Sequence, residues 1–272
     1  MTLLSRLYTI GTDPELFLFN NKTQKVISAI DKIPGCKAEP YTDNLPEGFG
    51  LQTDNILAEF NVPPVQREND FVENIEFMKN FIKNLAKGFN ENFDILCQAS
   101  AKVPAKELKH PQAKEFGCDP DFCVYTNGPN EVGKAARTNL RSAGFHIHVG
   151  YEGHNIDTSM SILRYIDVYV GIPSILYDTD VERRSLYGKA GCFRLQPYGF
   201  EYRTLSSFWI GNESRLRFIW KQLMYALFAS ERGKDLPQWQ IVRDTINNND
   251  IATAKQLIDE FGLIHPNNVK PD

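Results

Sequence analysis

The sequence lacks the features that would assign it to several large classes of protein. No apolar run approaches the roughly 20 residues that a membrane-spanning helix needs. Positive charge is not in excess, because 30 Lys and Arg stand against 34 Asp and Glu, for a net charge of -4. This balance argues against a general binder of nucleic acid or of anionic membranes. Residues 1–7 are too short and too polar for a secretory signal, so we expect a cytoplasmic protein.

Cysteine is scarce and shows no paired spacing. The cysteines are odd in number and none belongs to a CxxC pair; the five are Cys36, Cys97, Cys118, Cys123 and Cys192. Such a pattern is typical of reduced thiols in a cytosol and not of a disulfide framework or a zinc knuckle. A P-loop and a kinase-type glycine loop are also absent, which excludes those two nucleotide-binding folds.

Size and composition favour one globular unit. The chain has 272 residues, of which 42% are hydrophobic and 24% are charged, as in an ordinary globular enzyme. We see no internal repeat, no low-complexity tract and no clean linker. We therefore expect a single catalytic domain over residues 1–272, with a core of about 8–232 and a helical C-terminal extension of about 233–272.

A short stretch between two glycines, residues 142–150, carries two histidines at alternate positions. We expect a strand here, and side chains alternate between the two faces of a strand. His146 and His148 then share one face, and their apolar neighbours point into a core. Two adjacent imidazoles can hold a metal ion or an anion. The alternative is a pair of histidines hydrogen-bonded on a half-buried sheet, and no third His or Cys nearby completes a zinc site.

Two acidic stretches precede the histidines. Residues 8–19 are rich in β-branched and aromatic side chains and predict a strand in which Asp13 and Glu15 share a face. Pro14 cannot donate a hydrogen bond to a sheet, so an edge, a strand start or a bulge is expected there. Residues 51–62 predict a second strand, which contains two more acidic side chains.

Regular alternation along residues 51–62 would place Glu59 on the same face as Asn55. Asp54 would then point away from Glu59 unless a bulge turns it. The alternative for these carboxylates is a solvated outer face, because charged residues are mostly exposed.

Helices and one long irregular segment fill much of the remaining chain. Apolar residues at spacings of four and three predict an amphipathic helix over residues 71–89. Residues 106–141 have little periodicity, and we expect them to fold over a site. Asp157 and Asn212 are the expected N-caps of two later helices, the first with a break near Pro173. Two short helices are expected near the C-terminus, on either side of Asn247-Asn248-Asn249-Asp250.

Arginines and one glutamate alternate on the two short strands that follow a basic, glycine-punctuated loop at residues 183–191. Arg194 lies on the first strand, and Glu201 and Arg203 share a face of the second. Carboxylates outnumber imidazoles in the whole set, and oxygen-rich sites suit Mg²⁺ or Mn²⁺ better than zinc. Arginine forks hold phosphate oxygens. The set therefore predicts a metal–nucleotide site, and the alternative is a ladder of cross-strand ion pairs.

Five short motifs, in this order along the chain, resemble the phage-type carboxylate–amine ligases of the glutamine synthetase and glutamate–cysteine ligase superfamily. The resemblance spans roughly residues 8–209. The motifs are Gly11-Thr12-Asp13-Pro14-Glu15, Asp54-Asn55-Ile56-Leu57-Ala58-Glu59, Gly144-Phe145-His146-Ile147-His148-Val149-Gly150, Tyr187-Gly188-x-x-Gly191-x-x-Arg194 and Gly199-Phe200-Glu201-Tyr202-Arg203.

The resemblance implies an α+β fold with a curved, mainly antiparallel sheet and helices packed on its outer face, as in the glutamine synthetase catalytic fold. It implies ATP and Mg²⁺ or Mn²⁺ as cofactors. The implied metal ligands are Asp13, Glu15, Asp54, Glu59, His146, His148 and Glu201, without settling which histidine ligates. The implied catalytic arginines are Arg184, Arg194 and Arg203, and the implied nucleotide-binding residues are His146, Lys189, Arg194 and Arg203.

The implied activity is ATP-dependent ligation of a carboxylate to an amine through an acyl phosphate. The substrates would be small molecules or peptides, in the host cytoplasm if the protein is phage-encoded, with no nucleic-acid or membrane partner. Glutamine synthetase-like enzymes often assemble, so the resemblance allows a homo-oligomer. Two other functions stay open from the residues alone: a zinc hydrolase that uses the His146–His148 strand, and a non-catalytic protein that retains the fold.

Overall fold

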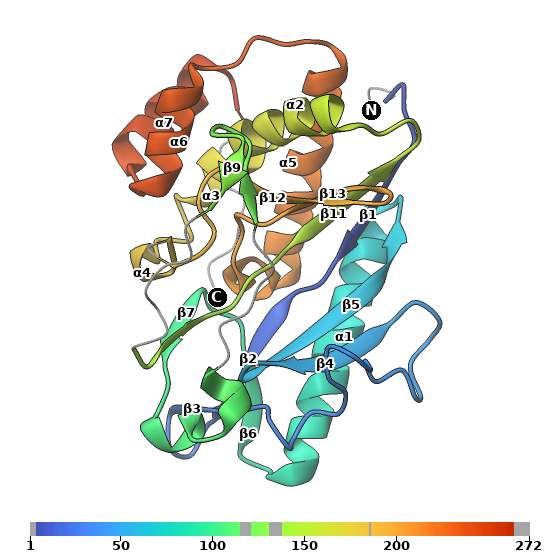
Figure 1. Ribbon diagram of the computed structural model, residues 1–272, viewed down its shortest axis with the longest axis vertical. Coiled ribbons are helices and arrows are strands. Elements are labelled where there is room, and N and C mark those ends of the chain that lie inside the picture. Colours follow the sequence, from blue (N-terminus) through green and yellow to red (C-terminus); the bar gives the residue numbers. More distant parts are fainter. Residues whose placement is uncertain (1–3, 115–120, 131–137, 185, 264–272) are drawn as a thin grey trace.

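The computed structural model describes residues 4–114, 121–130, 138–184 and 186–263, and its centre is one large antiparallel sheet (Figure 1). In spatial order the strands are β3 (Lys25–Ile27), β2 (Glu15–Asn20), β5 (Leu57–Val65), β1 (Tyr8–Thr12), β11 (Ile147–Tyr151), β13 (Gly199–Tyr202), β12 (Cys192–Gln196), β8 (Phe122–Cys123) and β9 (Gly128–Pro129). Strand β4 (Gly50–Asp54) pairs with β5, and β6 (Phe93–Leu96) pairs with β2. A separate two-stranded sheet joins β7 (Ser100–Lys102) to β10 (Leu140–Ser142). The expected α+β class with a mainly antiparallel sheet is confirmed.

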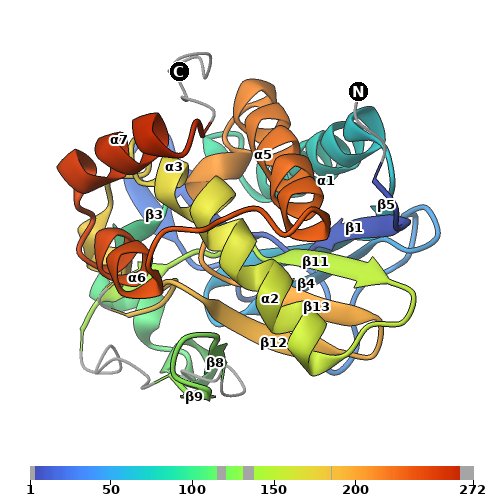
Figure 2. The ribbon, with the colours of Figure 1, turned by 90° about the horizontal axis from the view of Figure 1, so that it is seen from above.

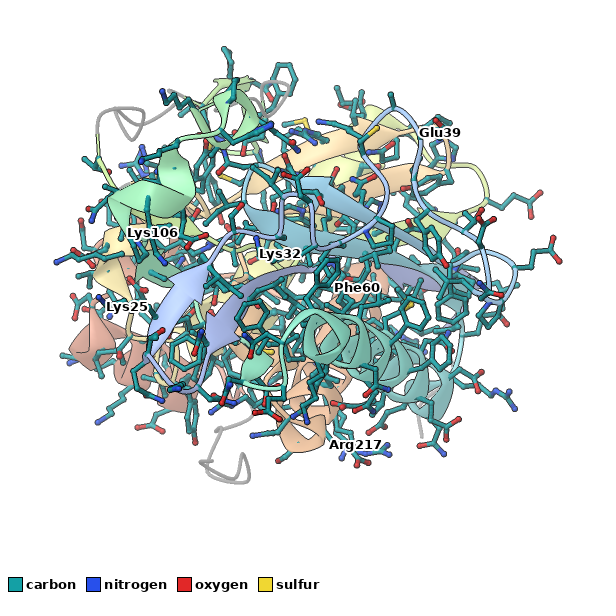
Figure 3. All side chains as sticks on the ribbon, turned by 90° about the horizontal axis from the view of Figure 1, so that it is seen from below. Lys25, Lys32, Glu39, Phe60, Lys106 and Arg217 are labelled. Carbon is teal, nitrogen blue, oxygen red and sulfur yellow. The ribbon has the colours of Figure 1, made fainter. Side chains whose placement is uncertain are left out.

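Three long helices cover one face of this sheet: α1 (Glu68–Phe89), α2 (Ile156–Ile166) and α5 (Glu213–Glu231). Figure 2 shows them side by side on the same side of β1, β11, β13 and β12. Phe60 is 1% exposed and lies where β5 meets α1 (Figure 3). Ile147 and Val149 of β11 belong to the same core, and neither side chain is exposed. The residue between them, His148, therefore points to the face without helices.

The predicted amphipathic helix over residues 71–89 is confirmed as most of α1, which buries Phe71, Ile75, Met78 and Ile82. Asn212 caps α5 as predicted, because its side chain accepts a hydrogen bond from the Arg215 amide at 3.0 Å. The cap of α2 is not Asp157 but Asn155, whose side chain accepts from the Thr158 amide at 2.9 Å. Both residue types favour N-caps, and the sequence alone did not distinguish them.

Beyond α2 the chain continues through a π-helical segment (Asp167–Gly171) into α3 (Ile172–Ser174). The irregularity expected near Pro173 thus begins earlier, at Asp167. The remaining helices are η1 (Ala105–Leu108), η2 (Pro111–Lys114), α4 (Val181–Arg184), η5 (Ser207–Ile210), α6 (Trp239–Asn247) and α7 (Ile251–Glu260). Helices α6 and α7 are the two short helices expected near the C-terminus. No helix among the described residues is both long and apolar enough to cross a bilayer.

The expected single strand over residues 51–62 is wrong. The chain instead folds into a hairpin of β4 and β5, in which Asp54 lies opposite Leu57 and Gln52 lies opposite Glu59. Asn55 occupies the turn with a positive φ of 54°, a conformation that asparagine adopts more readily than most residues. Opposed residues share a face, as do alternate residues of one strand. Asp54 and Glu59 therefore point to the same side of the sheet, contrary to the alternation predicted for one continuous strand.

Residues 8–19 also form two strands, β1 and β2, separated at Asp13 and Pro14, as the proline predicted. The segment of residues 106–141 contributes a short β8–β9 hairpin that extends the sheet beyond β12. The prediction that this segment folds over a site falls partly on residues 115–120 and 131–137, which lie outside the described residues.

Gly199 lets β13 approach β11 closely, and its replacement tests this register. Its φ is 151°, and a Cβ atom there would lie 2.1 Å from the Val149 carbonyl oxygen. We expect Gly199→Ala to destabilise the protein by more than the roughly 1–3 kcal/mol of backbone strain alone. Gly153→Ala is the control, since Gly153 also has a positive φ but nothing within 4 Å of the added atom. Equal losses of unfolding free energy in urea titrations of the two variants would contradict this register.

Candidate functional site

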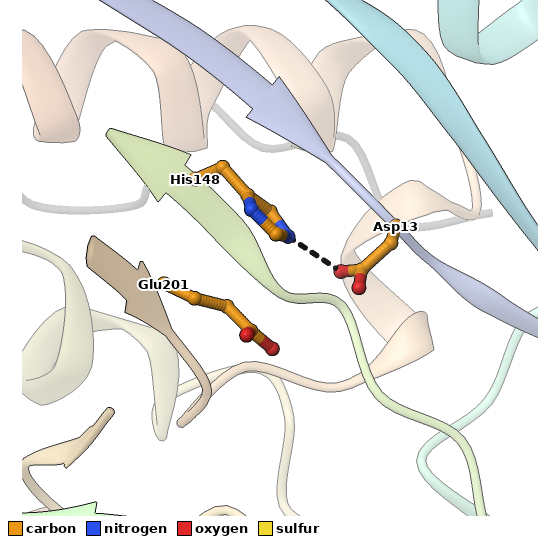
Figure 4. Close-up of side chains that lie close together, drawn as sticks. All are labelled: Asp13, His148 and Glu201. Atoms are coloured by element: carbon orange, nitrogen blue, oxygen red, sulfur yellow. Dashed lines mark ion pairs between the residues drawn. The ribbon is translucent and has the colours of Figure 1, made fainter. Parts of the chain in front are cut away.

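The face of the sheet without helices carries a row of polar side chains at its centre. In the register of four neighbouring strands, Gly11 lies opposite His148, His148 opposite Glu201, and Glu201 opposite Arg194. Directly opposed residues of antiparallel strands share a face, so these three side chains lie in one line. Gly11 contributes no side chain, and Asp13 reaches the row from the end of β1. Figure 4 shows Asp13, His148 and Glu201 pointing toward one another.

Asp13, His148 and Glu201 form a constellation that could hold a cation. One ligand atom from each residue lies within 4.8 Å of the other two. Asp13 Oδ1 is 3.1 Å from His148 Nε2 and 3.2 Å from His146 Nδ1. Asp13 Oδ1 and His148 Nε2 are both buried, and among the described residues these ion-pair contacts do not have the geometry of regular hydrogen bonds. Two carboxylates and one imidazole with such atoms are a donor set that fits a divalent ion.

Asp13 and His148 favour each other's charged forms. Burial opposes ionisation of Asp13, but the charges of His146 and His148 lower its pKa well below the usual range. Burial likewise favours a neutral His148 ring, but Asp13 and Glu201 raise the pKa of His148 above its usual value. A cation bound at His148 Nε2 would therefore compete with a proton for the same nitrogen.

Two side chains that the sequence did not single out support these groups from outside. Tyr198 forms a hydrogen bond through its hydroxyl with His148 Nδ1. Gln196 donates to Glu201 Oε2 at 3.2 Å. Burial, with the charges of Glu201 and Asp13, raises the pKa of Tyr198 to about 12 and keeps the phenol neutral. If Nε2 of His148 is to ligate a cation, Nδ1 carries the proton and donates a hydrogen bond to the Tyr198 hydroxyl oxygen.

Arg203, which directly follows β13, forms a buried ion pair with Glu201 of β13, and their side-chain exposures are 5% and 1%. Arg203 Nη1 is also 3.4 Å from His146 Nδ1, and Arg203 Nε is 3.7 Å from Asp121 Oδ2. Arg194 Nη1 lies 3.9 Å from Glu201 Oε2. The cross-strand ion pair of the alternative interpretation is thus present, but it shares Glu201 with the constellation that could bind a cation.

Three further carboxylates gather beside this group. Glu15 and Glu59 lie directly opposite each other on β2 and β5, and the β4–β5 hairpin adds Asp54 on the Glu59 side. Glu15 accepts a hydrogen bond from the Gly144 amide at 2.5 Å, and Glu59 accepts one from Gln52 at 2.8 Å.

The pKa values of all three carboxylates are raised. Burial raises the pKa of Glu15 and Asp54, and it raises that of Glu59 well above its usual value with help from the charges of Asp13, Glu15 and Asp54. Acids placed this close together repel one another unless protons or cations neutralise them.

The raised pKa values predict the pH dependence of stability. Glu15, Asp54, Glu59 and His148 hold protons more tightly when folded than when unfolded, so metal-free protein loses stability as pH rises above about 4. The opposite contribution of Asp13 is complete above its unfolded pKa of about 4 and does not change between pH 5 and 8.

We expect the melting temperature of EDTA-treated protein to fall from pH 5 to pH 8, and Mn²⁺ to raise it more at pH 8 than at pH 5. Glu59→Gln should flatten the metal-free slope. Calorimetric melting at several pH values checks this. A melting temperature that rises with pH, or a pH dependence that Glu59→Gln leaves unchanged, would contradict the proposed coupling of these carboxylates.

Not every predicted site residue reaches this face. Arg184 is buried, donates to the Gly188 carbonyl at 2.8 Å, and interacts electrostatically with Asp167 and Tyr202. Lys189 is half-buried, and its carbonyl accepts a hydrogen bond from the Thr204 hydroxyl at 3.0 Å. The neighbouring Arg183 interacts with Glu15 through its charge and donates to the carbonyls of residues 204 and 205. The roles predicted for Arg184 and Lys189 stay predictions.

Residues 132–260 match the model of a family described as phage phiEco32-like COOH.NH2 ligase-type 2. The matched region includes His146, His148, Arg194, Glu201 and Arg203 and leaves out the acidic strands near the N-terminus. No curated protein matches the sequence. The match supports a carbon–nitrogen ligase as the enzyme class, in agreement with the motifs.

One similar structure is that of a bifunctional glutathione synthetase from Pasteurella multocida, with a TM-score of 0.44 and 11% sequence identity. The similarity covers 97% of this chain and 48% of the other, so this chain spans about half the length of that protein.

Proposed function

We propose that the protein is an ATP-dependent carboxylate–amine ligase of the glutamine synthetase and glutamate–cysteine ligase superfamily. One observation carries the proposal: Asp13, His148 and Glu201 converge on the face of the sheet without helices, directly beside Arg203 and Arg194. Cation ligands and arginines at one place are what a metal-bound triphosphate needs. The matched family description points the same way.

The donor set fits divalent cations, and Mg²⁺ or Mn²⁺ suits its carboxylates better than zinc does. Asp13, His148 and Glu201 would hold one ion. We further propose Glu15 and Glu59, which lie opposite each other, and Asp54 on the same side as Glu59 as ligands of a second ion. When bound, such ions neutralise the phosphate oxygens of ATP and orient them. His146 lies between the two groups, because it contacts Asp13 and its charge acts on Glu15.

In the proposed reaction, an oxygen of the substrate carboxylate attacks the γ-phosphorus of ATP, and ADP leaves. The amine nitrogen then attacks the acyl carbon, phosphate leaves with the bonding electrons, and the nitrogen gives up a proton to form the amide. Arg203, held by Glu201, and Arg194 stabilise the charge on the transferring phosphoryl group. The carboxylate and the amine would be small molecules or peptides.

The test supplies purified protein with ATP, Mn²⁺ and pools of carboxylates and amines, and measures phosphate release together with the amide product by mass spectrometry. Hydroxylamine in place of the amine should trap the acyl phosphate as a hydroxamate. Reactions without the carboxylate pool are the control. Phosphate release that does not change when the carboxylate and amine pools are omitted would identify an ATPase and overturn the proposal. Tightly bound stoichiometric zinc together with hydrolase activity would also overturn it.

A further inference from the structure

A buried carboxylate lies on the other side of the sheet, within the helix layer. Asp167 begins the π-helical segment after α2 and is completely buried. It accepts hydrogen bonds from the Tyr202 hydroxyl at 2.7 Å and the Tyr125 hydroxyl at 2.8 Å, and a third from the Gly191 amide. Burial raises the pKa of Asp167 to about 6, and the three hydrogen bonds that it accepts act in the opposite direction.

Each of these three bonds holds a segment that carries a group of the candidate site. Tyr202 is the last residue of β13 and lies between Glu201 and Arg203, so fixing its ring on one face fixes its two neighbours on the other. Gly191 directly precedes β12, which carries Arg194.

Tyr125 lies in the turn between β8 and β9, so its bond to Asp167 anchors this hairpin. Asp121 directly precedes β8, and its Oδ2 atom is 3.7 Å from Arg203 Nε. Trp239 stacks on Tyr125 at 5.7 Å and fixes its ring further.

The local packing leaves little freedom for this arrangement. A Cβ atom on Gly171 would lie 3.0 Å from the Tyr202 hydroxyl and 3.2 Å from Asp167 Oδ1, so glycine makes room for the bond between them. Breaking a buried charged network by removing one member leaves the others unsatisfied in a dry interior. Outer partners of this kind also tune the groups that they orient, at a cost of about 10–100-fold in metal affinity when removed.

We propose that Asp167 is a positioning residue: through Tyr202, Tyr125 and the Gly191 amide it fixes Glu201, Arg203 and Arg194 for cation and phosphate binding. The catalytic consequence of this role rests on the proposed function. The effect of Asp167 on the position of β13 does not. Asp167 touches no reacting atom, since it acts from the opposite face of the sheet. In Asp167→Asn the amide nitrogen cannot accept a hydrogen bond, so one phenol loses its acceptor.

The test compares Asp167→Asn and Tyr202→Phe with a matched control, Tyr165→Phe. Tyr165 lies in the same helix layer and donates one hydrogen bond to the Lys234 carbonyl at 2.7 Å, so the control also removes a single phenol bond. Three quantities are measured in the full-length chain: hydrogen exchange of residues 199–205, Mn²⁺ affinity by calorimetry, and kcat and KM for ATP in phosphate release.

We expect Asp167→Asn and Tyr202→Phe to speed exchange at residues 199–205 and to weaken Mn²⁺ binding about 10–100-fold. The value of kcat should fall with little change in KM, and Tyr165→Phe should change none of these. Unaltered exchange and Mn²⁺ affinity in the two folded variants would overturn the proposal, as would equal changes in the control. If the wild type shows no ligase turnover but the exchange and Mn²⁺ effects appear, the proposed function fails and the positioning role stands. If the wild type binds no Mn²⁺, exchange alone decides.

Discussion

Glu201→Gln is expected to lower ATP-dependent phosphate release by more than about 100-fold, since loss of outer partners alone costs about 10–100-fold at metal sites. The amide keeps the size of the side chain but removes the negative charge shared by three groups. Those groups are the cation constellation, the Arg203 ion pair and the Arg194 contact. The same variant should weaken Mn²⁺ binding, which calorimetry measures without reference to turnover.

Glu107→Gln is the matched control for this prediction. Glu107 has a side-chain exposure of 14% and accepts a hydrogen bond from the Ser28 amide at 3.0 Å, so it is also a partly buried carboxylate with a structural contact. It belongs to η1 and has no part in the proposed chemistry. Turnover within about threefold of wild type is expected for Glu107→Gln. Equal losses in both variants would mean that Glu201 matters only for folding.

Arg203→Met is expected to destabilise the metal-free protein by about 3–5 kcal/mol, the usual cost of removing one partner of a buried ion pair. Glu201 is 1% exposed and would keep its charge without its principal counterion. Mn²⁺ should restore part of the loss, because a cation at Asp13, His148 and Glu201 would replace the missing positive charge. Urea unfolding with EDTA and with excess Mn²⁺ measures both effects.

Arg217→Met is the control for stability. Arg217 pairs with Glu213 at 2.6 Å and Glu68 at 3.3 Å on the surface, where such pairs contribute roughly 1 kcal/mol or less. The double variant Glu201→Gln with Arg203→Met should lose less stability than the sum of the two single variants, since the partners depend on each other. Additive losses, or no Mn²⁺ rescue of Arg203→Met, would contradict the coupling described above.

The pairs of residues at alternate positions were predictable from sequence because strand geometry is local. Alternation predicts that His146 and His148, and likewise Glu201 and Arg203, share a face. In the structure His146 directly precedes β11 and Arg203 directly follows β13, so each pair spans the end of its strand. That the two segments lie next to each other is a tertiary fact, and the order of motifs predicted it only through a family resemblance. The register of β11 with β13 then confirms that His148 and Glu201 are neighbours.

The hairpin at Asp54 and Asn55 shows where local reasoning failed. Residues 51–62 contain no glycine or proline, and their β-branched and apolar residues are compatible with one continuous strand. Asn55 supplies the positive φ that a tight turn needs, a signal that was available but outweighed by the pattern. Asp54 and Glu59 therefore lie on the same side of the sheet although the predicted backbone between them was wrong, and their role as ligands stays a prediction.

Supporting side chains were not predictable at all. Tyr198 precedes Gly199 in a turn between two strands, and only the fold brings its hydroxyl to His148. Asp167 is one acid on a helix, and the sequence does not reveal that it meets Tyr125 and Tyr202. Contacts of this kind join segments tens of residues apart, and no local period encodes them.

The most direct test of the account is a crystal structure of the protein with Mn²⁺ and a non-hydrolysable ATP analogue, read by the anomalous signal of manganese. The account predicts a manganese peak between Asp13, His148 and Glu201, with the triphosphate lying against Arg203 and Arg194 on the face without helices. Manganese bound elsewhere, or a nucleotide that does not reach this face, would contradict it.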